Sequence, residues 1–244
     1  MKQQLIAGRN PVWELVQSNT EVEKVLISKS AHGDIIKQII ETCREKNIYV
    51  QFVPEVKIQS LSKANHQGIL AFTSLIQYFD VQEIIDFIFD KGENPLLLIL
   101  DGITDIRNVG AIARTALGLG VHAIIIPKKG SASINDDAVK ISSGALLKIP
   151  VCRVDQLSTT VKDIKNNGIT LIGLDGQGKK FIADTELNKP LALIAGAEDE
   201  GISKDVQKLL DEKVKLPMSE ELESYNVSVA TAIALYEVYS GRMK

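Results

Sequence analysis

Cysteine and long apolar runs are both scarce in this 244-residue sequence. The two cysteines, Cys43 and Cys152, form no CxxC pair and no Cys/His cluster, which argues against a disulfide framework and against a structural zinc site. No window approaches the roughly 18 to 20 uninterrupted apolar residues that a membrane span requires. The opening stretch MKQQLIAGRNPVWE also lacks the apolar core of a signal peptide. We therefore expect a cytoplasmic protein that uses neither a metal nor a membrane.

The sequence has no basic excess either. Its formal net charge is −3, whereas nucleic-acid-binding proteins commonly carry a surplus of Lys and Arg. Any nucleic-acid binding would need a local patch, for which the candidates are the pairs Lys2 and Arg9, Lys128 and Lys129, and Lys179 and Lys180. Charge pairs on loops are commonly just solvated surface. The patches alone therefore do not indicate a partner.

The length and the hydrophobic pattern predict two α/β domains. Residues 1–75 read as a small unit with strands at 22–28, 48–53 and 67–74 and helices at 32–47 and 56–64. Residues 76–95 read as a linker that contains a short helix within 81–94, and the boundary is placed near Ile76.

After Pro95 the pattern changes to apolar strands that alternate with helices. Strands are expected at 96–100, 122–127, 149–154, 169–175, 190–196 and 213–216, and helices at 107–120, 135–147, 155–168, 203–213 and 226–239. The strands have few polar interruptions, as expected of strands buried on both faces of a parallel sheet. This order predicts a doubly wound α/β domain over residues 96–244.

Three loops follow strands at the edge where open α/β sheets bind ligands. The first is LDGITDIRNVGAIARTALGLG, in which Asn108 and Arg114 flank the start of a helix whose free N–H groups suit an anion. The alternative is that Asn108 is a helix cap and Arg114 a surface cation.

The second loop is LALIAGAEDEGIS, which places Gly196 directly after a strand and Glu198 two residues later. Small residues there let a ligand approach the backbone, although a plain acidic turn explains them equally well. The loop fits neither the G-x-G-x-x-G fingerprint nor a Walker motif. A nucleotide-dependent dehydrogenase is therefore a remote alternative.

The third loop is LPMSEELESYNVSVATAIALYE, in which a polar segment precedes an apolar helix. Ser224 and Asn226 are residue types that cap helix starts, but capping does not explain the polar segment before them. Each of the three loops is ambiguous by itself.

Taken together, NVGAIARTA, LIAGAEDEGIS and LPMSEELESYNVSVATA resemble in order and spacing the three motifs of the SpoU (TrmH) family of SPOUT methyltransferases. That family methylates ribose 2′-hydroxyl groups in RNA. The resemblance covers roughly residues 96–242, and GRNPVWE near the start resembles the bacterial subgroup that modifies a guanosine of 23S ribosomal RNA.

The resemblance implies a C-terminal SPOUT domain with a deep trefoil knot and an N-terminal domain like ribosomal protein L30e. It further implies S-adenosylmethionine as the methyl donor, bound in the knot mainly by backbone groups. The donor-binding residues carried over are Leu193, Gly196, Leu216, Met218, Tyr225 and Ser228. The polar third loop and the helix after it would together form the donor pocket.

The catalytic group implied by the resemblance is Asn108, Arg114, Glu198, Ser224 and Asn226. A guanidinium is effectively always protonated in proteins. We therefore assign Arg114 to binding a phosphate and stabilising negative charge, not to accepting a proton. Two residues depart from the family pattern, since Ile106 replaces a usual Pro and Tyr225 a usual Leu.

The resemblance also implies a homodimer that acts on ribosomal RNA, with Arg9 and Asn10 as candidate RNA contacts in the first domain. Two alternatives stay open. One is a guanosine 2′-O-methyltransferase that acts on transfer RNA, and the other is a non-catalytic RNA-binding protein. The joint presence of Asn108, Arg114, Glu198 and Asn226 argues against the non-catalytic alternative.

Overall fold

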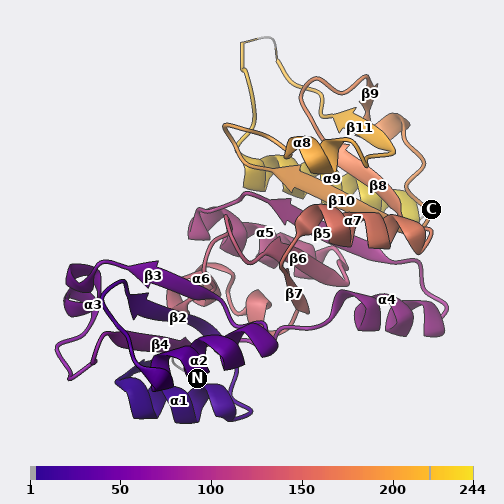
Figure 1. Cartoon of the computed structure of the whole chain (residues 1–244). Helices are drawn as coiled ribbons and strands as arrows, with labels where there is room; N and C mark the ends of the chain where they lie inside the picture. Colours follow the sequence, from indigo (N-terminus) through magenta and orange to yellow (C-terminus); the bar gives the residue numbers. More distant parts are fainter. Residues whose placement is uncertain (1–3, 220, 244) are drawn as a thin grey trace. The chain divides into compact units, whose positions relative to one another are not determined.

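A computed structural model of the protein describes residues 4–219 and 221–243. The chain forms two compact units, of which one comprises residues up to 77 with 134–136, and the other residues 78–133 with those from 137 onward (Figure 1). Each unit has its own sheet. Within the described ranges, no helix combines the length and the apolar character needed to cross a membrane.

The first unit is a small α/β unit, as predicted. Its elements are β1 (Leu5–Ala7), α1 (Arg9–Gln17), β2 (Val22–Ser28), α2 (Asp34–Glu45), β3 (Val50–Val53), α3 (Glu55–Leu61) and β4 (Ile69–Thr73). The strand order is β1-β4-β2-β3, in which β2 pairs parallel with β3 and antiparallel with β4. The sequence pattern missed the short strand β1 and the helix α1.

Strand β2 is buried on both faces because it lies between two clusters of side chains. Val25 and Ile27 pack with residues of α1 and α2, whereas Leu26 packs with Ile58 of α3. Successive side chains of a strand point to opposite faces. One face of this sheet is therefore covered by α1 and α2 and the other by α3.

The second unit contains a seven-stranded sheet in which every pairing is parallel, which confirms the predicted parallel α/β architecture. Its strands are β5 (Leu96–Asp101), β6 (Ala123–Pro127), β7 (Val151–Val154), β8 (Thr170–Leu174), β9 (Lys180–Phe181), β10 (Leu191–Gly196) and β11 (Glu212–Lys215). Its helices are α4 (Val81–Asp90), α5 (Ile106–Gly118), α6 (Asp136–Ile141), α7 (Leu157–Asn166), α8 (Lys204–Gln207) and α9 (Val227–Arg242), with 3₁₀ turns at Ala145–Leu147 and Ile182–Asp184.

The strand order of this sheet, β7-β6-β5-β10-β8-β11-β9, places a switch point between β5 and β10. After β5 the chain adds β6 and β7 on one side, and then builds β8, β10 and β11 on the other side. Open parallel sheets bind ligands at the carboxyl ends of strands next to such a point. The deep trefoil knot implied by the resemblance stays a prediction.

Two helices predicted in this unit were wrong in extent. The helix expected at 135–147 ends at Ile141, because Ser143 and Gly144 adopt positive φ angles of 52° and 80°. The helix expected at 203–213 stops at Gln207, and Glu212 and Lys213 instead pair with β8. In the second case strand pairing overrides a helical pattern, as tertiary contacts often do.

Residues 81–90, which the pattern placed within a linker, form α4. Its Ile85 and Ile88 are buried in the same cluster as Leu97 and Ile99 of β5. The side chain of Asp80 caps this helix by accepting hydrogen bonds from the N–H groups of its first turn. This helix therefore contributes to the core of the second unit.

Arg242 fixes the carboxyl end of α9 at the amino ends of β5 and β10. Its guanidinium donates hydrogen bonds to the carbonyl oxygens of Asn94 at 2.8 Å, Pro95 at 2.9 Å and Lys189 at 2.8 Å. Burial lowers the pKa of this guanidinium. Because α9 is fixed at this end and also packs on α5, its amino end has a defined place at the opposite edge of the sheet.

Candidate active site

A cavity of about 290 Å³ lies at the carboxyl ends of three adjacent strands of the second unit. Its lining includes Leu174, Gly196 and Lys215, which are the last residues of β8, β10 and β11. Pockets for small molecules typically measure about 300 to 1,000 Å³, so this cavity suits a small ligand or part of a larger one. Its place in the sheet is the one where parallel α/β folds bind ligands.

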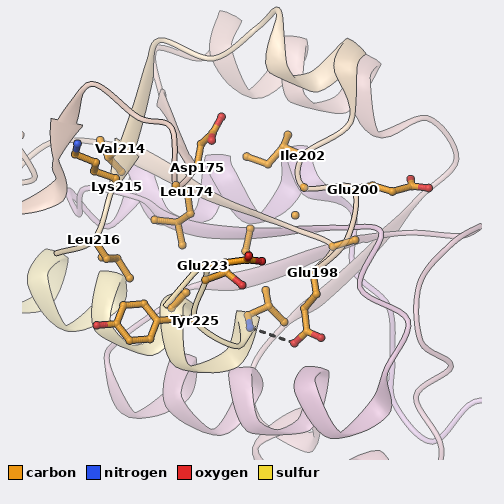
Figure 2. Close-up of a pocket in the computed structure, with 18 of the residues that line it drawn as sticks. Leu174, Asp175, Glu198, Glu200, Ile202, Val214, Lys215, Leu216, Glu223 and Tyr225 are labelled. Carbon is orange, nitrogen blue, oxygen red and sulfur yellow. Dashed lines mark hydrogen bonds between the residues drawn. The ribbon is translucent and has the colours of Figure 1, made fainter. Parts of the chain in front are cut away.

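The cavity wall combines apolar side chains with carboxylates. The apolar part includes Leu174, Ile202, Val214 and Leu216, and the ring of Tyr225 lies beside Leu216 (Figure 2). The carboxylates come from Asp175, Glu198, Glu200 and Glu223. An apolar wall suits a flat ring, and carboxylates favour a ligand with positive charge.

The wall formed by Leu174, Asp175 and Gly176 was not predicted from the sequence motifs. These residues follow β8, and Asp175 is held by the Lys213 ammonium group at 3.3 Å and by the N–H of Gln177 at 2.9 Å. The run LDGQG directly after an apolar strand was the available signal, because a strand that ends in Asp and Gly often leads into a turn.

Gly196 is required by its own loop. A Cβ atom placed on Gly196 would lie 2.1 Å from the carbonyl carbon of Gly201 and 2.2 Å from the backbone nitrogen of Ile202. The loop is held there by paired hydrogen bonds between Ala197 and Gly201, at 3.1 and 2.9 Å. The loop pattern predicted that a small residue here lets a ligand approach, whereas in the structure the returning residues 201–202 already occupy the space beside Gly196.

Glu198 joins the three motif loops through one of its carboxylate oxygens. Its Oε1 accepts hydrogen bonds from Nδ2 of Asn108 at 3.2 Å, from Nδ2 of Asn226 at 2.5 Å and from the backbone N–H of Val227 at 3.3 Å. The last of these bonds is drawn in Figure 2. Asn226 also donates from Nδ2 to Oδ1 of Asn108 at 3.1 Å. Three of the five predicted catalytic residues therefore form one hydrogen-bonded group.

Asn226 is also the cap of α9. Its Oδ1 accepts hydrogen bonds from the backbone N–H of Ser228 at 3.0 Å and from the Ser228 hydroxyl at 2.6 Å. The predicted cap is thus confirmed for Asn226. Ser224 instead lies exposed among the residues that line the cavity.

Tyr225 closes the third loop. Its hydroxyl donates a hydrogen bond to the carbonyl oxygen of Pro217 at 3.1 Å, which joins the two ends of the loop. Leu, the usual residue at this position in the resemblance, has no hydroxyl and cannot form this bond.

The start of α5 corrects one interpretation of the first loop. The helix is capped by Asp105, whose Oδ1 accepts the N–H of Arg107 at 2.8 Å, and not by Asn108. The Arg107 guanidinium also bonds to this carboxylate and lowers the pKa of Asp105. Ile106 occupies the first helical position, where Pro is favoured because no helical N–H is lost. Replacing the usual Pro by Ile106 is therefore compatible with the helix start.

Arg114 stands apart from the group around Glu198. It lies exposed on α5, and within residues 4–219 and 221–243 its guanidinium forms no hydrogen bond or ion pair. A free guanidinium at this place remains available to a partner that is absent from the isolated chain.

The predicted donor-binding residues divide into two sets. Gly196, Leu216, Met218 and Tyr225 line the cavity. Leu193 is fully buried in the middle of β10, and Ser228 lies in the first turn of α9; neither is among the lining residues. Any contact of these two residues with a ligand stays a prediction.

Of the two candidate RNA contacts in the first unit, Arg9 already forms two hydrogen bonds with Gln67. Its Nε donates to the carbonyl oxygen of Gln67 at 3.2 Å, and its backbone N–H donates to the side chain of the same residue. Asn10 is exposed. Their role in binding RNA stays a prediction.

The two cysteines are free and buried, and burial raises the pKa of each thiol to about 12. They are therefore protonated near neutral pH and poorly reactive. In the described part of the chain, no group of three or more His, Cys, Asp or Glu residues is arranged to hold a metal ion.

Comparisons with known proteins match both units. The profile of the SpoU rRNA Methylase family matches residues 95–236, and the profile described as RNA 2′-O ribose methyltransferase substrate binding matches residues 5–79. The chain is 34% identical over 237 residues to YacO of Bacillus subtilis (strain 168), which is named as a TrmH family tRNA/rRNA methyltransferase. That match covers 97% of this chain and 95% of YacO.

Two solved structures show similar folds. The SpoU methyltransferase AviRb from Streptomyces viridochromogenes, in complex with the cofactor AdoMet, matches with a TM-score of 0.63 and 23% identity over 99% of this chain and 91% of its own. The TrmH/SpoU tRNA modifying enzyme of A. aeolicus matches with a TM-score of 0.56 and 26% identity. That second match covers 66% of this chain and 84% of the A. aeolicus chain.

The contact at Gly196 predicts a specific loss of stability. Gly196→Ala should lower the free energy of unfolding by about 1–3 kcal/mol, because the added methyl group forces the backbone of residues 201–202 away. Gly176→Ala is a matched control, since nothing lies within 4 Å of a Cβ atom there. Urea denaturation of both variants measures the difference. Equal stability of Gly196→Ala and the wild type would contradict the crowded loop.

Proposed function

The chain belongs to the SpoU family of RNA 2′-O ribose methyltransferases, and on this premise we propose that it transfers a methyl group from S-adenosylmethionine to the ribose 2′-hydroxyl of a guanosine in 23S ribosomal RNA. The observation that carries the proposal is the convergence of Asn108, Glu198 and Asn226 beside a cavity at the carboxyl ends of parallel strands. Such a site can hold a small donor next to polar groups that position an acceptor.

The residues around the cavity fit the methyl donor. Leu174, Ile202 and Leu216 offer an apolar wall for an adenine ring, and Met218 also lines the cavity. The carboxylates of Glu200 and Glu223 favour the positive charges of a sulfonium and an ammonium group. AviRb, whose fold matches both units, binds AdoMet. When bound, this donor supplies an electrophilic methyl group.

The polar group beside the cavity fits a ribose. The amide of Asn108 is fixed by Glu198 and by Asn226, so its remaining N–H and the remaining acceptor site of its oxygen have defined directions. Fixed donors and acceptors can orient a hydroxyl group for in-line attack, and alignment of this kind supplies much of an enzyme's acceleration.

Arg114 contributes positive charge to this reaction. Its guanidinium is always protonated, so it cannot remove a proton from the ribose. As it has no partner among the described residues, it can bind a phosphate of the RNA and stabilise negative charge that develops on the attacking oxygen.

The first unit supports an RNA substrate with extended structure. The family that matches residues 5–79 is a substrate-binding domain of RNA 2′-O ribose methyltransferases. The match to the tRNA modifying enzyme of A. aeolicus covers 66% of this chain. The additional unit would recognise structured RNA through its shape and backbone, and we propose ribosomal RNA by analogy with the subgroup that GRNPVWE resembles.

Incubation of the full chain with labelled S-adenosylmethionine and either 23S ribosomal RNA or transfer RNA tests the proposed function. We expect label in ribosomal RNA, at a guanosine whose ribose resists alkaline cleavage at its 3′ side. Label confined to transfer RNA would contradict the ribosomal substrate, and absence of label from both would contradict methyl transfer to these RNAs.

Substitution of Arg114 tests its role as a charge stabiliser. Arg114→Ala should lower kcat at least about 100-fold, as expected when one group that stabilises developing charge is removed. The affinity for S-adenosylmethionine, measured by calorimetry, should change little because Arg114 does not line the cavity. Lys162→Ala removes an exposed cation of α7 as a control. Near-normal turnover of Arg114→Ala would remove this residue from the mechanism.

The implied homodimer has a suitable surface on α9. Val229, Tyr236 and Tyr239 are 46%, 59% and 39% exposed and lie on one face of the helix. Light scattering should give twice the monomer mass of 26.7 kDa, and Tyr236→Glu should shift the protein toward the monomer by placing charge in the contact. A wild-type protein that is monomeric and active would contradict the dimer.

A further inference from the structure

The two carboxylate oxygens of Glu198 have very different surroundings. Oε1 accepts three N–H groups, from Asn108, Asn226 and Val227. Oε2 accepts no hydrogen bond from any residue in 4–219 or 221–243. Because all three donors point at Oε1, this oxygen does not carry a proton. The carboxylate is therefore anchored through one oxygen and has the other available to a ligand.

Several other groups near Glu198 are poor proton acceptors. Arg114 is always protonated, and the amides of Asn108 and Asn226 are not bases. Asp105 is held on both oxygens by Arg107, and Asp175 is paired with Lys213.

The described part of the second unit has one histidine, His122, and it does not lie at this edge of the sheet. His122 precedes β6, at the amino edge of the sheet, where its Nδ1 accepts the N–H of Leu96. His32 and His66 belong to the first unit. Glu200 and Glu223 also line the cavity, but among the described residues the carboxylate that contacts both amides of the polar group is Glu198.

We propose that Oε2 of Glu198 accepts the proton of the ribose 2′-hydroxyl during methyl transfer, an assignment that rests on the proposed function. The 2′-oxygen forms a bond to the methyl carbon, the bond from that carbon to sulfur breaks, and its electron pair stays on sulfur. The hydroxyl proton moves to Oε2, which leaves a methyl ether, a thioether and a neutral carboxylic acid. Charge and atoms balance without a further reactant.

An anchored carboxylate is basic enough for this step. As the proton moves to the carboxylate, negative charge develops on the 2′-oxygen, and the Arg114 guanidinium that stabilises this charge makes the hydroxyl more acidic than that of a free alcohol. Proton transfer to a carboxylate is then favourable, and a positioned base of this kind contributes about 10²- to 10⁴-fold to a rate. Arg114 and Glu198 then have separate tasks, since the first stabilises charge and the second accepts the proton.

A purely structural role for Glu198 makes a different prediction. Its Oε1 accepts the N–H of Val227, one of the free groups at the start of α9, and so helps to cap that helix. Glu198→Gln separates the two roles, because the amide oxygen of Gln can replace Oε1 while its NH₂ group replaces Oε2 and cannot accept a proton.

The first measurement compares the methylation rates of the wild type and the variants on the RNA that the wild type modifies. Glu198→Gln should lower kcat at least 100-fold, while the affinity for S-adenosylmethionine by calorimetry and the unfolding midpoint stay close to those of the wild type. Asp199→Asn makes the same change of charge at the neighbouring exposed residue, which does not line the cavity, and should keep wild-type activity. Turnover of Glu198→Gln within threefold of the wild type would overturn the proposal.

Chemical rescue shows whether the loss of activity comes from the missing carboxylate or from a structural change caused by the substitution. Formate should restore the activity of Glu198→Ala at least tenfold in a concentration-dependent way, because it returns a carboxylate to the vacated place. Absence of rescue in a variant that is folded and binds the donor would overturn the proposal.

A measurement on the protein without donor or RNA follows the anchor of the same carboxylate. The amide resonance of Val227, whose N–H donates to Oε1, should keep its position in Glu198→Gln and shift in Glu198→Ala. A resonance that moves as far in Glu198→Gln as in Glu198→Ala would contradict the anchoring through Oε1 on which the proposal rests. Failure of the wild type to methylate any RNA would instead overturn the proposed function, so the two failures are distinguishable.

Discussion

One carboxylate oxygen holds together three segments that are far apart in the sequence. Oε1 of Glu198 accepts hydrogen bonds from Asn108, which opens α5, and from Asn226 and Val227, which open α9. Hydrogen bonds to a charged acceptor are stronger than those between neutral groups. This contact and the direct hydrogen bond from Asn226 Nδ2 to Asn108 Oδ1 at 3.1 Å together fix both helix starts next to the cavity.

The sheet of the second unit provides the frame for this contact. β10 lies between β5 and β8, so the loop that carries Glu198 leaves the centre of the sheet. Gly196 lets the loop fold back on the strand end. At the opposite edge, Arg242 fixes the far end of α9 to the backbone of the segments that precede β5 and β10. The helix is thus held at both ends, and its amino end is placed by the rest of the fold.

The buried parallel strands were readable from the sequence. The runs that became β5, β6 and β10 are apolar on both faces, a pattern typical of parallel sheets. Local pattern failed where a long-range contact decides the conformation. Glu212 looked like the end of a helix, yet it pairs with Ile172 of β8. The break after Ile141 depends on the positive φ of Ser143, which no periodicity reveals.

The site was readable only in part. The resemblance grouped Asn108, Glu198 and Asn226, which the structure brings into contact, but spacing alone left Asn108 as a possible cap, a position that Asp105 occupies. The wall at Leu174 could not be assigned from the motifs, because it belongs to a strand that becomes a neighbour only through the sheet order. The need for glycine at position 196 likewise comes from a contact with the returning residues 201–202, which the sequence pattern does not reveal.

The central claim is that the cavity at the ends of β8, β10 and β11 holds the methyl donor beside the group around Glu198. A crystal structure of the protein with S-adenosylmethionine tests it most directly. The account predicts density for the donor against Gly196, Leu216 and Tyr225, with the methyl group facing the side chains of Asn108 and Asn226. Density for the donor at another place, with this cavity empty, would contradict it.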